Sequence, residues 1–151
     1  MDFIVNFVII TLFIFPVIAL IHELGHAFFL KLFGGAVKEF AIGNGNVLWK
    51  KNVFFIKTAY FAGGRVVPEN IEILSKNKKM FFYLGGVLFN LLSALTLHFL
   101  SGYEFFVFRN YLDSFIFVSY LNVIINLIPL VTVIGPTDGK QIIDLSRKVI
   151  N

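Results

Sequence analysis

The chain has 151 residues, about the length of one domain, and we expect a single domain over residues 1–151. Hydrophobic residues make up 58% of it, twenty residues are Phe, and the mean hydropathy is +0.84. So short a soluble protein could not bury that much apolar surface. The absence of Cys excludes disulfides, thiolate metal sites and a Cys nucleophile. The net charge of +4 does not indicate a nucleic-acid partner, because the basic residues flank apolar runs.

Three apolar segments are long enough to cross a bilayer, which takes about 20 helical residues. The first runs from Phe3 to Ile21 and continues as a helix through Phe33, the second is Met80–Leu100, and the third is about Ser114–Ile134. The first segment has neither the basic start nor the cleavage site of a signal peptide, so we predict a retained span. The predicted fold class is a mainly α, polytopic membrane protein with three core transmembrane helices.

A β-hairpin or small sheet is predicted between the first two helices. Short strands are expected at Val37–Ile42, Asn46–Trp49 and Val53–Tyr60, with turns at Gly43–Gly45 and Lys50–Asn52 and a break at Phe61–Gly64. Two interpretations are open. The segment is either a cytoplasmic hairpin or a membrane-associated sheet in the interface beside the first helix, where protein or water must satisfy its backbone.

The ends of the remaining helices and the membrane orientation also follow from the sequence. Ser75 is a plausible N-cap for the second helix, and Gly139–Asn151 resembles an amphipathic helix on the membrane surface. Twelve of the 13 Lys and Arg residues lie between the first two spans or after the third, against Arg109 alone between the second and third. We therefore predict a multi-pass protein of the cell membrane, with the N-terminus outside and the 34–79 segment and C-terminus cytoplasmic.

The stretch His22-Glu23-Leu24-Gly25-His26 carries the strongest chemical signal. Residues four apart share one helix face, so His22 and His26 can hold one metal ion, and Glu23 is placed to accept a proton from a zinc-bound water. Ionisable residues on an apolar helix are energetically expensive and usually functional. Gly25 would let another element approach closely. The alternative is a solvated helix end, but Lys31 lies beyond the motif, which places the motif within the cytoplasmic leaflet.

A catalytic zinc takes a third protein ligand, and Asp138 is the best candidate. His98 is expected near the outer end of the second span, on the opposite side of the membrane. Asp138 follows the third span at about the depth of the two His residues. Its alternative role is a capping box with Gln141 for the last helix.

Polar residues on the second and third spans form two faces. Ser119, Asn122 and Asn126 share one stripe on the third span, and the second span carries Gly85, Gly86, Asn90 and Ser93. For Asn90 and Asn122, helix–helix contact and substrate contact are both open. Asn126 is nearer the predicted site and is the better candidate for an active-site polar contact.

Together these motifs resemble the site-2 protease family of intramembrane zinc metalloproteases. That family has HExxH on its first core helix, a Gly-Pro-x-x-x-Asn-like element on the second, and Asn-x-x-Pro with Pro-x-Asp-Gly on the third. The matching residues here are His22–His26, Gly85–Asn90 without the Pro, Asn126–Pro129 and Pro136–Gly139.

The resemblance implies Zn²⁺ held by His22, His26 and Asp138, with Glu23 as general base and Asn126 as a possible polar contact. One departure is that Val131–Gly135 lengthens the third element by about one helical turn, which would shift Asp138 by about 6 Å unless the insert bulges outward.

The predicted function is hydrolysis of a peptide bond within or near the transmembrane segment of a membrane-protein or membrane-peptide substrate. The alternative is a catalytically inactive binding or adaptor protein derived from the same fold, which the longer spacing favours. Metal transport is a weaker hypothesis, because no polar relay continues from the predicted site to the outer side.

Overall fold

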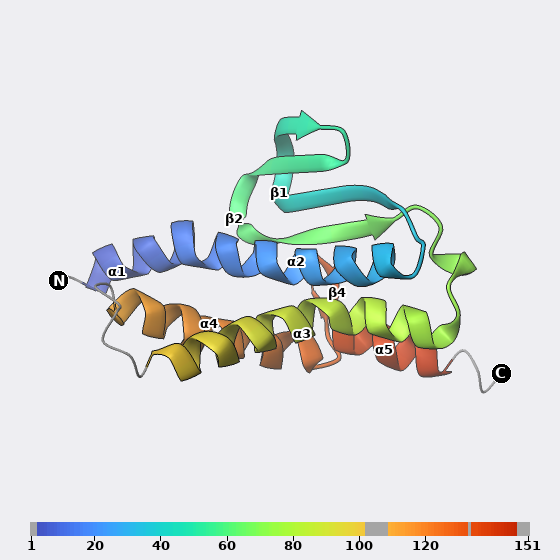
Figure 1. Ribbon diagram of the computed structural model, residues 1–151. Helices are drawn as coiled ribbons and strands as arrows, with labels where there is room; N and C mark the ends of the chain where they lie inside the picture. The colour runs from blue at the N-terminus through green and yellow to red at the C-terminus, as the bar shows by residue number, and fades with distance from the viewer. Residues whose placement is uncertain (1–2, 102–108, 133, 148–151) are drawn as a thin grey trace.

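A computed structural model describes residues 3–101, 109–132 and 134–147 of the chain. Three long helical segments lie side by side along one axis, and a curled β-sheet lies against the first of them (Figure 1). The first and last helices of the described residues lie toward opposite ends of this axis (Figure 1). The element order is helix, sheet, two helices, a small hairpin and a last short helix.

The first helical segment is continuous, as predicted. It consists of α1 (Phe3–Ile9), a π-helical turn η1 (Ile10–Ile14) and α2 (Phe15–Leu32). The π turn precedes Pro16, which has no N–H to donate to the preceding turn, so the helix adjusts its hydrogen bonding there. The segment ends before Gly34, whose φ of +83° lies in the left-handed region that Gly adopts without strain.

The second helix, α3 (Lys76–Leu100), begins earlier than the predicted span. A short 3₁₀ turn, η2 (Ile71–Ile73), precedes it, and Ser75 occupies the N-cap position. The Ser75 side chain makes no cap hydrogen bond. Instead its backbone carbonyl accepts from Lys79 N–H at 3.0 Å.

The third predicted span is shorter than expected. α4 is Arg109–Leu127, so the segment 128–134 was wrongly assigned to a span. Pro129 cannot continue the helix, which explains why α4 ends two residues before it.

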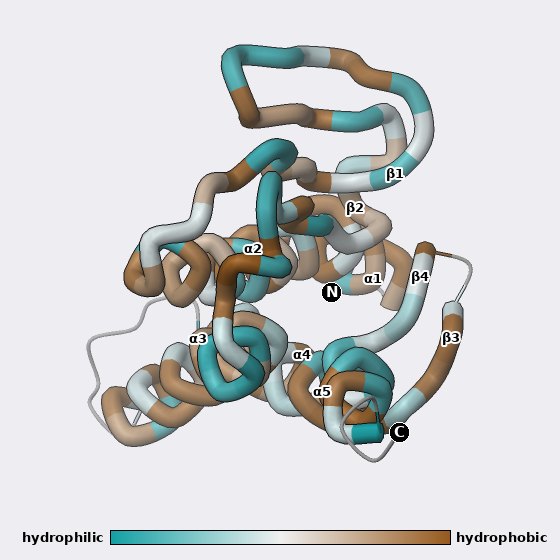
Figure 2. Tube along the Cα trace, turned by 90° about the vertical axis from the view of Figure 1, so that its right-hand side faces the viewer, coloured by the Kyte–Doolittle hydropathy of each residue, from teal (hydrophilic) through white to brown (hydrophobic). Residues whose placement is uncertain are grey.

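Within the part of the chain that the structure describes, two helices are long and apolar enough to cross a membrane, Phe3–Leu32 and Lys76–Leu100. The asparagines of α4 lower its hydropathy, so the structure supports two spans and leaves the third as a prediction. Hydrophobic residues predominate along the helices in Figure 2. Large side chains such as Phe13, Phe28 and Phe117 are half or more exposed, as expected for surfaces that contact lipid.

The sheet has two long strands, β1 (Val37–Lys51) and β2 (Phe54–Pro68), rather than three short ones. The predicted turn at Gly43–Gly45 and the predicted break at Phe61–Gly64 are both wrong, because these glycines lie within strands. Gly43, Gly45 and Gly63 have φ near +85 to +88°, which allows the strands to bulge and curl without ending. The turn near Asn52 is confirmed: Asn52 has a φ of +54°.

The curl folds β2 around β1. The central part of β1 pairs with both halves of β2: Phe40, Ala41 and Ile42 face Val66, Arg65 and Gly64 on one side and Phe54, Phe55 and Ile56 on the other. The sheet contacts α2 along its length, so its position beside the first helix agrees with the second interpretation of this segment (Figure 1).

An ion-pair cluster joins the two halves of β2 through β1. The Glu39 carboxylate accepts from Lys57 Nζ at 2.9 Å and from the Arg65 guanidinium at 2.9 and 3.2 Å. Partial burial alone would raise the pKa of Glu39, but these two cations hold it below its usual range. Glu39 therefore tethers Arg65, which lies at the edge of the cavity described below.

After α4 the chain forms a small antiparallel hairpin, β3 (Val131–Thr132) with β4 (Gly135–Pro136), and then α5. α5 is Asp138–Arg147, one residue earlier than predicted at its start, and it is amphipathic as expected. The rest of the predicted helix, residues 148–151, lies outside the described residues.

Candidate metal centre

Helices α2 and α3 touch through their backbones at two glycines. A Cβ atom on Gly25 would lie 2.1 Å from the Gly85 carbonyl oxygen, and one on Gly85 would lie 2.5 Å from the Gly25 carbonyl oxygen. No other residue fits at either position without moving the helices apart. The expected close approach at Gly25 is therefore confirmed, and it brings the His-bearing face of α2 against α3.

The two imidazoles of the HExxH motif converge on one point. His22 Nε2 and His26 Nε2 are 3.1 Å apart, and both residues are at most 7% exposed. His26 Nδ1 lies 2.7 Å from the Phe82 carbonyl oxygen of α3. Because a carbonyl can only accept, Nδ1 carries the proton, and the Nε2 lone pair of His26 is left free.

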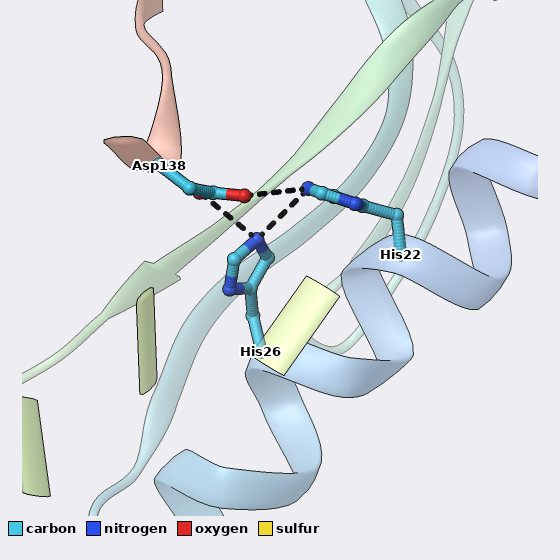
Figure 3. A group of neighbouring side chains, drawn as sticks. All are labelled: His22, His26 and Asp138. Atoms are coloured by element: carbon cyan, nitrogen blue, oxygen red, sulfur yellow. Dashed lines mark hydrogen bonds and ion pairs between the residues drawn. The ribbon is translucent and has the colours of Figure 1, made fainter. Parts of the chain in front are cut away.

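Asp138 completes the group from the start of α5 (Figure 3). One carboxylate oxygen lies 3.1 Å from His22 Nε2 and the other 3.4 Å from His26 Nε2. Asp138 is only 4% exposed, and its Oδ2 atom has no hydrogen-bond partner among the described residues. The structure thus brings together all three residues that the sequence suggested as ligands.

The β3–β4 hairpin explains how Asp138 reaches the His pair despite the longer spacing. Leu130 and Thr137 flank the hairpin, and Thr137 N–H donates to the Leu130 carbonyl at 3.0 Å. The insert therefore forms a closed loop whose two ends meet. A Cβ on Gly139 would lie 2.0 Å from the Leu127 carbonyl oxygen, so α5 begins directly against the end of α4. The insert forms a hairpin instead of an extra helical turn, so the longer spacing does not displace Asp138 from the two imidazoles.

Thr137, and not Asp138, caps the N-terminus of α5. Lys140 N–H lies 3.4 Å from Thr137 Oγ1, and Gln141 N–H donates to the Thr137 carbonyl at 3.0 Å. Thr137 is thus the N-cap of α5. The same hydroxyl donates to the Ile128 carbonyl at 2.7 Å, which ties the cap to the end of α4. The Asp138 carboxylate is left free to face the imidazoles.

The geometry and chemistry of this group fit zinc. Two ligand atoms each about 2.0–2.1 Å from a tetrahedral ion lie roughly 3.3 Å apart. Here the two Nε2 atoms are 3.1 Å apart, His22 Nε2 lies 3.1 Å from Asp138 Oδ2, and His26 Nε2 lies 3.4 Å from Asp138 Oδ1. With one ligand atom from each residue, the three atoms lie within 4.8 Å of one another. Two imidazoles with one carboxylate form a ligand set typical of catalytic zinc sites that keep one position open. Asp138 Oδ2 is buried beside these imidazoles without a hydrogen bond, and a bound cation would satisfy it.

A cavity of about 490 Å³ opens onto the three candidate ligands. Glu23 lines the same cavity and is 5% exposed. A Cβ on Gly64 would lie 2.8 Å from Glu23 Cγ, so β2 packs directly on this side chain. The β3–β4 hairpin forms part of the cavity wall through Thr132, Gly135 and Pro136.

The polar residues of α3 and α4 divide into two groups. Asn122 and Asn126 line the cavity, whereas Asn90 is fully buried and lies behind His22, with its Nδ2 atom 3.4 Å from His22 Nδ1. His98 packs against Phe99 and Tyr120 toward the other end of α3 and takes no part in the group.

The sequence of the chain matches peptidase family M50 over residues 10–109. This chain belongs to peptidase family M50. The match confirms the predicted resemblance to the site-2 proteases, which are metallopeptidases associated with membranes. It includes the HExxH helix and α3 and stops at the first residue of α4, so Asp138 is placed by the structure and not by the family match.

The M50 chain is also similar to the uncharacterized membrane protein YwmF of Bacillus subtilis (strain 168). The two are 27% identical over 125 residues, which is 83% of this chain and 78% of that protein. The family, this relative and the two apolar helices together place the chain in a membrane.

Two features of the site were missed in the sequence. Gly63, Gly64 and Val66 line the cavity. The sequence did not predict this, because a Gly-Gly pair usually indicates the end of a strand and not a strand that forms a cavity wall. Thr137 is the N-cap, and the pattern Thr-Asp-Gly-Lys was compatible with either Thr137 or Asp138 in that role. The contact of Thr137 with Ile128 could have decided between them, but it depends on tertiary structure.

If the insert is a closed loop that carries no ligand, removing its tip will leave the metal centre intact. We predict that deleting Thr132–Gly135, which joins the paired residues Val131 and Pro136, leaves the zinc affinity within about threefold of that of the intact chain. Loss of a residue that supports a metal ligand typically weakens metal binding by about 10–100-fold, so a smaller change would show that the deleted residues have no such role. The measurement is zinc stoichiometry and affinity in detergent. A folded deletion variant, judged by its thermal transition, that no longer binds zinc would contradict this account of the spacing.

Proposed function

We propose that this M50 chain is an intramembrane zinc metalloprotease that hydrolyses a peptide bond within or near the transmembrane segment of a substrate protein. The observation that carries the proposal is the convergence of His22, His26 and Asp138 within 4.8 Å, from two elements far apart in the sequence. Glu23 lines the same cavity on the same apolar helix. Burying ionisable side chains on so apolar a helix costs free energy, so such residues are usually functional.

The chemistry follows from the roles of these residues. Zinc bound by the three ligands would lower the pKa of an attacking water to about 7 and polarise the scissile carbonyl. Glu23 accepts the proton of that water and later delivers it to the leaving amine. His26 is held for ligation by its hydrogen bond to the Phe82 carbonyl. Asn126, in the wall of the cavity, is placed to contact the substrate.

A substrate segment must be extended near the site, because an intact helix hides its peptide bonds. Strand β2 from Gly63 to Val66 lines the cavity, and one of its edges is already paired with β1. We infer that an unwound substrate adds to its other edge, opposite the β3–β4 hairpin. Gly63 leaves room for a substrate side chain at this edge, because a Cβ atom there would have only Ile134 Cδ1 nearby, at 4.0 Å.

The alternative of an inactive adaptor rested on the longer spacing before Asp138. That support is lost, because Leu130 and Thr137 meet across the base of the insert. No other observation in the described residues favours the adaptor over the protease.

We further propose that the chain crosses the cell membrane with its N-terminus outside and with the sheet and α5 on the cytoplasmic side. The start of α3 and α5 lie at the same end of the molecule, away from the N-terminus (Figure 1). These two elements carry Lys76, Lys78, Lys79, Lys140 and Arg147. Basic residues gathered at one end of a helical bundle are typical of the cytoplasmic side.

The mechanism predicts that Glu23→Gln abolishes cleavage while zinc stays bound. Loss of a general base typically costs about 10²–10⁴-fold in rate. The assay is proteolysis of fluorescently labelled casein, an unfolded probe, by the full chain in detergent, together with zinc content. Glu69→Gln, which changes an exposed Glu at the end of the sheet, is the matched control. Undiminished cleavage by Glu23→Gln would refute the mechanism, and no cleavage by the wild-type chain containing zinc would favour the adaptor.

The orientation is testable because the chain has no Cys. We predict that a membrane-impermeant maleimide labels Ser101→Cys, at the end of α3, in intact cells. Lys51→Cys, at the tip of the sheet, should be labelled only after lysis. The reverse labelling pattern would overturn the proposed orientation and leave the metal site untouched.

A further inference from the structure

A chain of three side-chain amides runs from His22 to α4. Asn126 Nδ2 lies 3.0 Å from the Asn122 backbone carbonyl oxygen and 2.9 Å from Asn122 Oδ1. Asn90 Nδ2 lies 2.9 Å from the same Oδ1 and 3.4 Å from His22 Nδ1. Helix α4 supplies none of the three candidate ligands. Asn122 nevertheless links α4, through Asn90, to the candidate ligand His22 on α2.

We propose that Asn122 is a positioning residue of the metal centre, which orients the His22 imidazole by holding the Asn90 amide against it. This inference rests on the proposed zinc site. The hydrogen bonds of the Asn122 side chain go to Asn90 and Asn126 and to none of the three candidate ligands, so it acts through Asn90 on His22.

The direction of the hydrogen bonds along this chain is determined by the backbone. The Asn122 carbonyl can only accept, so Asn126 must present its NH₂ group there. Asn122 Oδ1 then accepts from Asn126 and from Asn90, and Asn90 presents its NH₂ group to His22 Nδ1. Because Asn90 is 0% exposed, water does not reach its amide to replace a lost partner.

A second contact, at the Nε2 atom of the His22 ring, also indicates that Nδ1 of His22 carries no proton in this arrangement. His26 Nδ1 donates to the Phe82 carbonyl, so His26 Nε2 is an acceptor. It lies 3.1 Å from His22 Nε2, which must therefore carry the His22 proton in this arrangement. The ring also has little freedom to move, because a Cβ on Gly86 would lie 2.5 Å from His22 Nε2.

Ligation through His22 Nε2 requires the proton to reside on Nδ1 instead. Nδ1–H then needs an acceptor, and Asn90 Oδ1 is buried with no hydrogen-bond partner among the described residues. Asn90 can supply this oxygen by turning its amide, provided that Asn122 turns with it to present its NH₂ group. The Asn126 NH₂ group then gives up its hydrogen bond to the Asn122 side chain and keeps the one to the Asn122 backbone carbonyl. An amide at position 122 can hydrogen-bond to Asn90 in both orientations of the Asn90 amide, as an acceptor in one and as a donor in the other. An aliphatic side chain can do neither.

The test is the zinc affinity of the full chain in detergent, measured by competition with a chelating indicator. We expect Asn122→Leu and the smaller Asn122→Ala to weaken zinc binding by about 10–100-fold, the usual effect of losing an outer-shell partner. Asn110→Leu, an exposed asparagine on the same helix, is the matched control and should bind zinc like the wild-type chain. The visible spectrum of the cobalt-substituted protein should also change in the position-122 variants only.

The outcomes separate this inference from the proposed function. Wild-type zinc affinity and an unchanged cobalt spectrum in Asn122→Ala would overturn the positioning role while the metal centre stands. A wild-type chain that binds no zinc would overturn the proposed function itself. If Asn122 contacts only substrate, zinc affinity will stay unchanged in both variants and the Michaelis constant for casein will rise, which also overturns the positioning role.

Discussion

The approach of the Asp138 carboxylate to two imidazoles is the interaction on which the rest of the site depends. His22 and His26 alone form an incomplete site on the buried face of a helix. One oxygen of Asp138 lies 3.1 Å from His22 Nε2 and the other 3.4 Å from His26 Nε2, which creates a ligand set that matches zinc in number and chemistry. The three side chains are nearly inaccessible to water, so their polar atoms must be satisfied by one another, by the backbone or by an ion.

Two local devices make that approach possible. The glycine contact between α2 and α3 brings the His face against α3, where the Phe82 carbonyl orients His26. The Thr137 cap and the close contact of Gly139 with Leu127 start α5 directly beneath the same face. Both devices rely on backbone groups and small residues, so the ligands are held by the fold and not by long flexible side chains. This arrangement suits a metal centre, which tolerates little positional error.

Much of the site could be predicted from the sequence because its signals are local. Two His residues four apart on a helix share a face by helical geometry, and Glu23 stands beside the first of them. Asp138 was harder, because its distance to the His pair depends on how an insert folds. The sequence suggested either a shifted acid or a bulge, and only the hydrogen bond between Leu130 and Thr137 distinguishes them.

The sheet was predicted less well, since strand pairing is set by contacts between distant residues. Gly43 and Gly63 look like turn and break residues, yet both lie within long strands that bulge and curl. The role of Asn122 was also open between helix contact and substrate contact. Its position as a junction between two other asparagines depends on the packing of α3 against α4, which no pattern within either helix specifies.

The most direct test of the central claim is the zinc content of the purified full chain and of its Asp138→Ala variant. We predict about one zinc per chain in the wild type and a loss of most of it in the variant, since a site with two ligands binds zinc far more weakly. Asp144→Ala, which changes an acid on the same helix that pairs with Lys140, should keep its zinc. Full zinc content in Asp138→Ala, or none in the wild-type chain, would contradict the account.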